Sequence, residues 1–240
     1  MTKSVSKKSY LQVSYDEKKL PRTQYPYKLS SYLQNKFFKN LQADSSAILD
    51  VGCGRGEFLE AFTELGFKVS GVDISPSLEN LEKNFNVSQC DFEKDSLPYN
   101  ENSFDFLFSK SVVEHLHYPE KLVDECFRIL KPGGKAIFMC PSWVHTYWGP
   151  FYIDHTHVTP FTLPSLSQLM QLSGFEIVYA DHFVQLPVLW KMPFLKIISE
   201  ITALLPIHFR PLYKTSLPEP INKWVRFSKE KMLLVVGEKK

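Results

Sequence analysis

Short apolar runs alternate along the chain with segments in which apolar residues recur every three or four positions. We expect strands at the apolar runs, which cover residues 47–51, 67–72, 87–90, 104–108, 135–140, 175–179 and 232–236. Between them, helical spacing is found at 57–65, 78–85, 120–130 and 163–172. Such alternation indicates a parallel sheet covered on both faces. The pattern predicts an α/β, doubly wound fold with a mostly parallel seven-stranded sheet and an antiparallel C-terminal edge strand.

Two segments lie outside this alternation. Apolar residues on one helical face predict a helix over 25–41. In the Pro-rich stretch after residue 184, the spacing over 194–205 predicts an amphipathic helix that packs on the core, roofs a substrate or lies on a membrane. We therefore divide the chain into a basic N-terminal segment with a cap helix (1–43), a core (44–183), an insertion that is a lid or faces a membrane (184–230) and a final edge strand of the core (231–240).

The composition is that of a globular protein. Hydrophobic residues make up 44% and charged residues 22% of the 240 residues, which excludes a disordered or fibrous chain. There is no uncharged apolar run long enough to span a bilayer. The polar start of the chain does not resemble a secretory signal. Four cysteines without close pairing are typical of buried thiols in a cytoplasmic protein.

The net charge of +2 conceals an uneven distribution. Residues 1–40 carry +7, residues 41–183 carry −11 and residues 184–240 carry +6. This pattern favours a compact catalytic unit whose flanking segments contact an anionic partner. The alternative interpretation is a solvated lysine-rich surface. We expect a cytoplasmic protein that could associate peripherally with the inner face of an anionic membrane.

A glycine-rich turn, Asp-Val-Gly-Cys-Gly-Arg-Gly-Glu at 50–57, follows the first expected strand and opens a helix. Asp73 and Asp91 end the next two strands, at the rim where open α/β sheets bind ligands, and a carboxylate at 73 can accept both ribose hydroxyls. A dinucleotide site needs G-x-G-x-x-G, whereas Glu57 would repel a pyrophosphate here. Asp50 and Glu57 suit a cation better, so charge favours S-adenosylmethionine.

The region 47–180 resembles the class I S-adenosylmethionine-dependent methyltransferases, in the branch found in quinone and surface-polysaccharide biosynthesis. The matching motifs cover 49–56, 72–73, 90–92, 97–106, 113–116 and 128–134. The resemblance implies a Rossmann-like fold, with the glycine loop around the methionine moiety, one acid at the ribose and another at the adenine. The cofactor-binding residues that it implies are Asp50, Gly52, Cys53, Gly54, Gly56, Asp73, Ile74, Asp91, Phe92 and Ser109.

Methyl transfer to a hydroxyl needs a positioned acceptor and a base, a role that suits histidine. The segment 154–162, Asp-His-Thr-His-Val-Thr-Pro-Phe-Thr, resembles one found in methyltransferases of surface-polysaccharide pathways, which have Arg where this chain has Thr159. The matched histidine is His157, so we predict it as the base, with His155 next and His115 third. No metal is expected; the alternative is a metal ligated within 154–157.

The sequence contains less information about the methyl acceptor than about the cofactor. The turn at 109–112 lacks the Pro-Pro-aromatic signature of nucleobase methyltransferases, so no nucleic acid partner is expected. Aromatic residues within 143–152 suit a sugar ring or a quinone. The leading hypothesis is O-methylation of a sugar or glycan intermediate, including a lipid-linked one, in polysaccharide biosynthesis. The alternatives are a methyltransferase of a quinone or lipid small molecule and a non-catalytic S-adenosylmethionine-binding protein.

Overall fold

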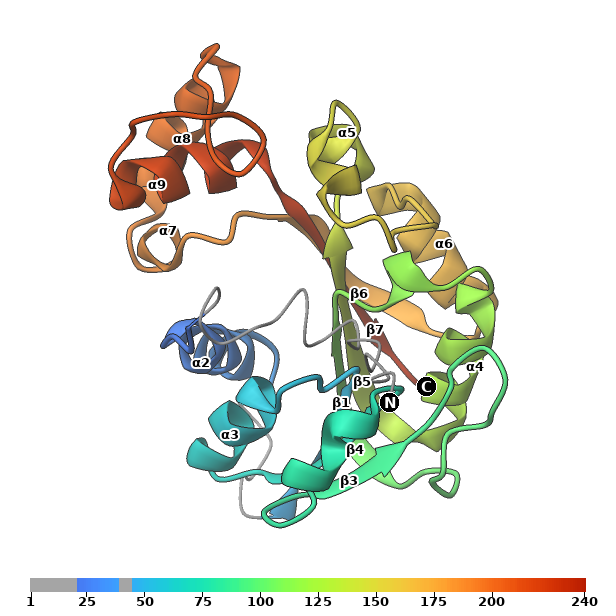
Figure 1. Cartoon of the computed structure of the whole chain (residues 1–240). Helices are drawn as coiled ribbons and strands as arrows, with labels where there is room; N and C mark the ends of the chain where they lie inside the picture. The colour runs from blue at the N-terminus through green and yellow to red at the C-terminus, as the bar shows by residue number, and fades with distance from the viewer. Residues whose placement is uncertain (1–20, 39–44) are drawn as a thin grey trace, which may run out of the picture.

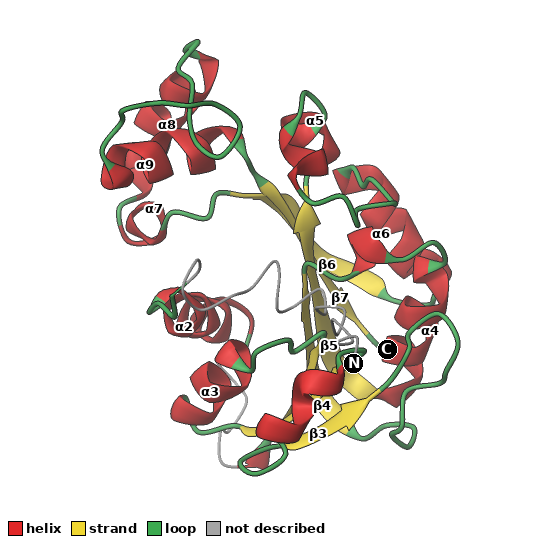
Figure 2. Cartoon of the chain, viewed as in Figure 1, coloured by secondary structure: helices red, strands yellow, loops and turns green. Residues whose placement is uncertain are grey.

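The computed structural model describes residues 21–38 and 45–240. These residues form one seven-stranded sheet with helices on both faces and the strand order β3-β2-β1-β4-β5-β7-β6 (Figures 1 and 2). Neighbours among β1 to β5 pair in parallel, whereas β7 is antiparallel to both of its neighbours. The mostly parallel seven-stranded sheet is thus confirmed. The strands are β1 (Ala47–Val51), β2 (Lys68–Asp73), β3 (Asn86–Gln89), β4 (Phe104–Lys110), β5 (Leu130–Pro141), β6 (Glu176–Phe183) and β7 (Met232–Glu238).

The C-terminal strand is antiparallel as expected, but its expected position at the edge of the sheet is wrong. Strand β7 lies between β5 and β6, and β6 forms the edge. The physical reason is burial. Residues 232–237 of β7 are all buried, as suits a strand with covered faces and two neighbours, whereas β6 has several exposed residues along its length.

Two helix layers cover the sheet. Helices α2 (Tyr25–Phe37) and α3 (Glu57–Glu64) lie on one face, and α4 (Pro119–Ile129) and α6 (Leu163–Leu172) lie on the other (Figure 1). Each layer encloses its own apolar core against the strands. Local chemistry sets where α6 begins, because Thr162 and Ser165 form a reciprocal capping box ahead of the first turn.

Two expected helices differ from the structure. Over 78–85 there is no α-helix; instead, a 3-10 helix, η2 (Pro76–Asn80), is followed by turns. The connection from β2 to β3 has about the minimum length for a parallel crossover, which leaves little room for a regular helix. The helix expected over 25–41 ends at Phe37, and residues 39–41 lie outside the described part of the chain.

The Pro-rich insertion between β6 and β7 contains α7 (Pro187–Lys191), η5 (Pro193–Leu195), α8 (Lys196–Leu204) and α9 (Glu219–Lys229). Figure 1 shows α8 and α9 standing beyond the end of the sheet, on the same side as α2. A further short helix, α5 (Trp143–Thr146), follows β5. None of the helices in the described ranges is long and apolar enough to cross a membrane. All four cysteines are buried free thiols, as expected.

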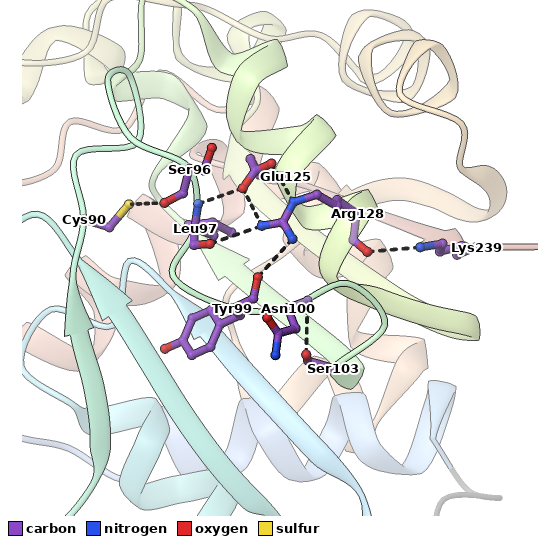
Figure 3. Close-up of polar contacts among 9 residues, drawn as sticks. All are labelled: Cys90, Ser96, Leu97, Tyr99, Asn100, Ser103, Glu125, Arg128 and Lys239. Atoms are coloured by element: carbon purple, nitrogen blue, oxygen red, sulfur yellow. Dashed lines mark hydrogen bonds and ion pairs between the residues drawn. The ribbon is translucent and has the colours of Figure 1, made fainter.

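The Arg128 side chain fastens the segment that leads into β4 against α4 (Figure 3). Its guanidinium donates to the Tyr99 and Leu97 carbonyl oxygens at 3.0 and 3.1 Å and binds the Glu125 carboxylate at 2.7 and 2.8 Å. The same carboxylate accepts the Leu97 N–H at 2.7 Å. One fork-shaped cation and one carboxylate therefore fix a connection that has no regular secondary structure.

We expect Arg128→Ala to lower the free energy of unfolding by roughly 2–3 kcal/mol, because it removes four charge-assisted hydrogen bonds and leaves Glu125 without its cation. Arg128→Lys should recover less than half of the loss, since an ammonium lacks the planar fork. The measurement is urea unfolding, with the exposed Lys94→Ala as the control. A loss below about 0.5 kcal/mol would contradict this account.

Candidate active site

The cofactor rim is built by the carboxyl ends of neighbouring strands. Val51 at the end of β1 pairs with Val72 of β2 on one side and with Ser109 of β4 on the other. Residue 73 follows Val72 directly, so the glycine loop after β1 emerges between an acid and a buried serine. The carboxyl ends of parallel strands thus bring together residues far apart in sequence, as in other open α/β sheets.

The glycine loop needs its glycines for both conformation and space. Gly52 has a φ of 82°, and a Cβ there would lie 2.2 Å from the Val112 side chain. Gly54 also has a positive φ, of 51°, but a Cβ there would meet nothing within 4 Å. Gly52 is therefore required by packing, whereas Gly54 presents bare backbone to open space, as a ligand-binding loop does.

Asp73 holds the glycine loop in place. Its carboxylate accepts the Gly54 N–H at 2.8 Å through one oxygen and the Ser75 N–H at 2.8 Å through the other. The side chain is 8% exposed. A carboxylate has about four acceptor sites, so two remain for ribose hydroxyls. The predicted ribose-binding acid is thus also the residue that orders the loop, a role that the sequence did not indicate.

Asp50 lies beneath the loop at the end of β1 and is buried, with an exposure of 2%. One of its carboxylate oxygens has no hydrogen-bond partner among the described residues. Burial and the nearby Asp73 charge raise the pKa of Asp50 to about 8. An orphaned buried carboxylate under bare glycine backbone fits a cationic ligand, because a positive group would supply its missing donor.

Glu57, the second acid that the sequence places at the glycine loop, is compensated by a nearby cation. Glu57 is paired with Arg55 at 3.0 Å, so much of its charge is compensated within the protein. Arg55 also offers its carbonyl oxygen to the Arg22 guanidinium at 3.3 Å, which ties the N-terminal segment to the loop. Glu57 therefore presents less negative charge to a pyrophosphate than its place in the sequence indicates, and Asp50 and Asp73 are the acids that favour a cation.

The other predicted cofactor residues lie around the same rim. Asp91 is bound by the Lys94 ammonium at 2.6 Å, which lowers the pKa of Asp91, and its other oxygen accepts the Glu93 N–H. Cys53, Phe92 and Ser109 are buried, whereas Ile74 is 55% exposed next to Asp73. The structure thus gives Asp91 a partner within its own turn, and its role at the adenine stays a prediction.

The structure brings two of the three predicted catalytic histidines together. The rings of His115 and His157 lie edge to face, with centroids 4.7 Å apart, and both are half-buried. The contact is held by backbone, because the Glu114 carbonyl oxygen accepts the N–H groups of Val158 and Thr159 at 2.9 and 3.0 Å. His155 is exposed to solvent, so it lacks the enclosure that the pair has.

Hydrogen bonds define which nitrogen of each histidine carries a proton. His157 Nδ1 lies 2.6 Å from the Phe151 carbonyl oxygen, which can accept but not donate. His115 Nδ1 lies 2.8 Å from the Thr156 hydroxyl, whose own proton is donated to Asp154 at 2.6 Å. Both Nδ1 atoms are therefore donors, and in the neutral rings both Nε2 atoms carry a lone pair.

Burial keeps both rings neutral at physiological pH. It lowers the pKa of His115 to about 4, with His157 adding to the effect, and it also lowers the pKa of His157. A neutral imidazole with an oriented lone pair can accept a proton from an acceptor hydroxyl. The pair is therefore ready to act as a base without prior deprotonation.

Glu114 completes the cluster, and in the sequence it is marked only by its place in the matching motif at 113–116. It is fully buried, and its carboxylate oxygens have no hydrogen-bond partner among the described residues. Burial raises its pKa to about 8. Ligand atoms of Glu114, His115 and His157 lie within 4.8 Å of one another, so the three residues could hold a metal ion. The expectation of a metal-free site therefore stays a prediction.

A pocket of about 210 Å³ opens beside the two histidines. Asp154, Ile153 and Gln185 line it together with Glu114. Three cations on its walls were not predicted from the sequence: Lys110 at the end of β4, Arg226 of α9 and Lys231 just before β7. The position of Lys110 at the end of a strand, on the ligand-binding edge of the sheet, could have indicated its role. Nothing in the sequence linked the insertion to the site.

Thr159, where the similar polysaccharide-pathway segment has Arg, donates to the Leu116 carbonyl oxygen at 2.5 Å. It therefore joins the two histidine-bearing segments. In this chain, the position has a structural role in closing the site.

Comparison with known proteins agrees with this geometry. The model of the methyltransferase domain family matches residues 22–180. A ubiquinone biosynthesis O-methyltransferase from Coxiella burnetii is 36% identical over 150 residues, and one from Nitrosococcus oceani is 37% identical over 98 residues. These matches cover 55% and 38% of this chain, and 64% and 42% of the relatives. The matched region thus spans less than two thirds of the length of either relative.

A solved structure of a SAM-dependent methyltransferase from Archaeoglobus fulgidus has the same fold. It superposes with a TM-score of 0.63 at 22% identity and covers 96% of this chain and all of that one. The fold, the glycine loop and the family match define the class, a Rossmann-like methyltransferase. The chain belongs to the methyltransferase domain family, and its cofactor is S-adenosylmethionine.

We expect Asp73→Ala to weaken S-adenosylmethionine binding roughly 100-fold or more, because charge-assisted bonds to the ligand and the anchor of Gly54 are lost together. Calorimetric titration measures the affinity. Asp105→Ala, which removes a carboxylate from the opposite end of the sheet, is the control. Cofactor affinity within threefold of the wild type in the Asp73 variant would contradict the assignment.

The raised pKa of Asp50 predicts a pH dependence of cofactor binding. The free protein holds a proton on Asp50 below about pH 8, and a cationic group bound beside it favours the ionised form. Binding at pH 7 should therefore release a proton, and affinity should rise with pH up to about 8 and then level off.

Calorimetry in buffers of different ionisation enthalpy measures this proton release. Asp50→Asn should abolish both the release and the pH slope. An unchanged slope in that variant would show that another group titrates.

Proposed function

We propose that this methyltransferase transfers a methyl group to a hydroxyl of a small ring acceptor of the phenolic or quinone-precursor type. The observation that carries the proposal is the histidine pair. His115 and His157 hold Nε2 lone pairs beside a pocket whose wall begins at Lys110, next to the rim residue Ser109. An O-methyltransferase needs a proton acceptor at that place, because the acceptor hydroxyl must lose its proton as the new O–C bond forms.

Cofactor and protein have separate tasks in this reaction. S-adenosylmethionine supplies an activated methyl group. The chain holds the acceptor hydroxyl near a neutral imidazole and takes its proton at Nε2, while the Phe151 carbonyl oxygen and Thr156 fix the two rings. Lys110 adds a cation whose pKa is lowered by burial, and a nearby positive charge stabilises a developing phenolate.

The pocket volume favours a compact ring. An apolar cavity of about 150 Å³ is known to hold benzene, so about 210 Å³ has room for one ring with its substituents. The lining places acids, cations and histidines around that space. A phenol with neighbouring oxygen substituents matches this mixture better than an unsubstituted hydrocarbon does.

The choice of acceptor class rests on the relatives. The two curated proteins described above are ubiquinone biosynthesis O-methyltransferases, and they support the quinone alternative. They give no support to the expectation of glycan O-methylation in polysaccharide biosynthesis.

The test combines an acceptor panel with a base variant. We expect turnover, followed as S-adenosylhomocysteine release, with 3,4-dihydroxybenzoate or a longer-tailed catechol but not with simple monosaccharides. His157→Gln should lower kcat roughly 10²–10⁴-fold while cofactor binding persists. His155→Gln is the matched control, because His155 is exposed. Equal loss in both variants, or activity on the sugars alone, would overturn the proposal.

The rate should also report the lowered histidine pKa values. A base must be unprotonated, so kcat should fall only when the pH drops well below the ordinary histidine value of about 6.5. A pH–rate profile with the acid limb at or above 6.5 would contradict the assignment of this pair.

A further inference from the structure

Helix α8 is amphipathic in the reverse sense of a core helix. Its buried residues are Ser199 and Thr202, whereas its large apolar side chains face outward. We call these exposed side chains the α8 apolar face: Phe194, Ile197, Ile198, Ile201, Leu204 and Leu205. Most of them recur three or four residues apart, so they share one side of the helix. Exposures of 68% at Ile197 and 86% at Leu204 show how little the described chain covers them.

Specific polar contacts hold α8 with this face outward. The Ser199 hydroxyl bonds the Ser228 hydroxyl of α9 at 2.9 Å, and the Trp224 indole N–H donates to Thr202 Oγ1 at 3.1 Å. Lys229 caps the end of α8 through the carbonyl oxygens of Ala203 and Leu205, at 3.0 and 2.6 Å. Because the inward side is satisfied by hydrogen bonds, rotating the helix to hide the apolar face would leave buried polar groups unpaired.

The charges around the face select the partner. In this insertion, the exposed acids Glu200 and Glu219 are paired with cations at Lys231 and Arg210. Lys191, Lys196 and Lys214 are exposed and make no ion pair with any described residue. The surplus is therefore positive. Two copies of the chain meeting through this face would bring like charges together, whereas an anionic lipid surface would neutralise them.

We propose that the α8 apolar face inserts into the interface of an anionic lipid bilayer and attaches the protein peripherally. A helix with an exposed apolar side and flanking lysines lies in the plane of such an interface, with its side chains among the acyl chains and its cations at the headgroups. This inference rests on α8 and its surroundings and is independent of the acceptor assigned to the active site.

Vesicle co-sedimentation tests the proposal on the full chain. We expect the wild type to bind vesicles of phosphatidylcholine with phosphatidylglycerol, and to bind pure phosphatidylcholine vesicles several-fold more weakly. Ile197→Ser with Leu204→Ser should lower the partition coefficient roughly tenfold or more, because two side chains no longer leave water. Leu172→Ser is the matched control, since Leu172 is 80% exposed on α6, and it should bind like the wild type.

A second arm tests the charge. Lys191→Gln with Lys196→Gln should lower binding to the anionic vesicles several-fold and reduce its dependence on salt. Calorimetric binding of S-adenosylmethionine to every variant shows that each one is folded, because the cofactor rim lies outside the insertion.

Three results would overturn the proposal. One is a wild-type protein that stays in solution with every vesicle at every salt concentration. Another is an Ile197/Leu204 variant that sediments like the wild type. The third is a dimer, seen by analytical ultracentrifugation, that the same double variant dissociates while lipid binding is unchanged or absent, which would assign the face to a second copy of the chain.

Discussion

The hydrogen bonds of the Asp73 carboxylate are the interaction on which the cofactor rim depends. One oxygen holds the backbone of the glycine loop and the other holds the turn after β2. A loop with three positive-φ glycines has high conformational entropy when free, so a buried acceptor that fixes one of its N–H groups is needed to give it one shape. The same oxygens remain able to accept ligand hydroxyls. Loop order and cofactor recognition therefore share one side chain.

Buried acids give the active site its electrostatic character. Burial raises the pKa of Asp50, under the loop, and of Glu114, beside the histidines, to about 8 each. Asp50 lies near the carboxyl end of β1, where a cationic cofactor would gain from a nearby carboxylate, and Glu114 lies in η3 (Val113–His115), which follows β4 and contains His115. Burying an acid costs desolvation free energy, and proteins retain such groups where ligand binding offsets that cost. Acids with shifted pKa values therefore cluster at functional sites.

The sequence predicted much of the architecture because periodicity is a local signal. The seven strands and helices α2, α3, α4 and α6 follow from apolar spacing, and the family follows from motifs on the strand ends. The position of β7 inside the sheet was missed, because pairing depends on contacts between distant segments. The helix expected over 78–85 failed because the length of the β2–β3 crossover outweighed local spacing.

The site was predicted in part for similar reasons. Glycines and acids at strand ends are visible in sequence. The hydrogen bond from the Gly54 N–H to Asp73 is a tertiary contact between two strand ends, and the direction of the Arg55 side chain toward Glu57 is not given by their spacing. His115 and His157 are 42 positions apart, and their contact depends on backbone bonds to Glu114. Lys231 reaches the pocket because β7 is antiparallel to β5, so that the start of β7 at Met232 pairs with Pro141 at the carboxyl end of β5.

Helix α9 joins two regions that the chain uses for different purposes. Ser228, near its end, is bonded to α8, while Arg226 and the adjoining Glu230, bonded to each other at 2.7 Å, line the pocket. The contacts with α8 and with the pocket are thus made from the same carboxyl-terminal end of α9. The insertion and the pocket wall therefore share one anchoring segment, and a displacement of this segment by the insertion would change the dimensions of the pocket.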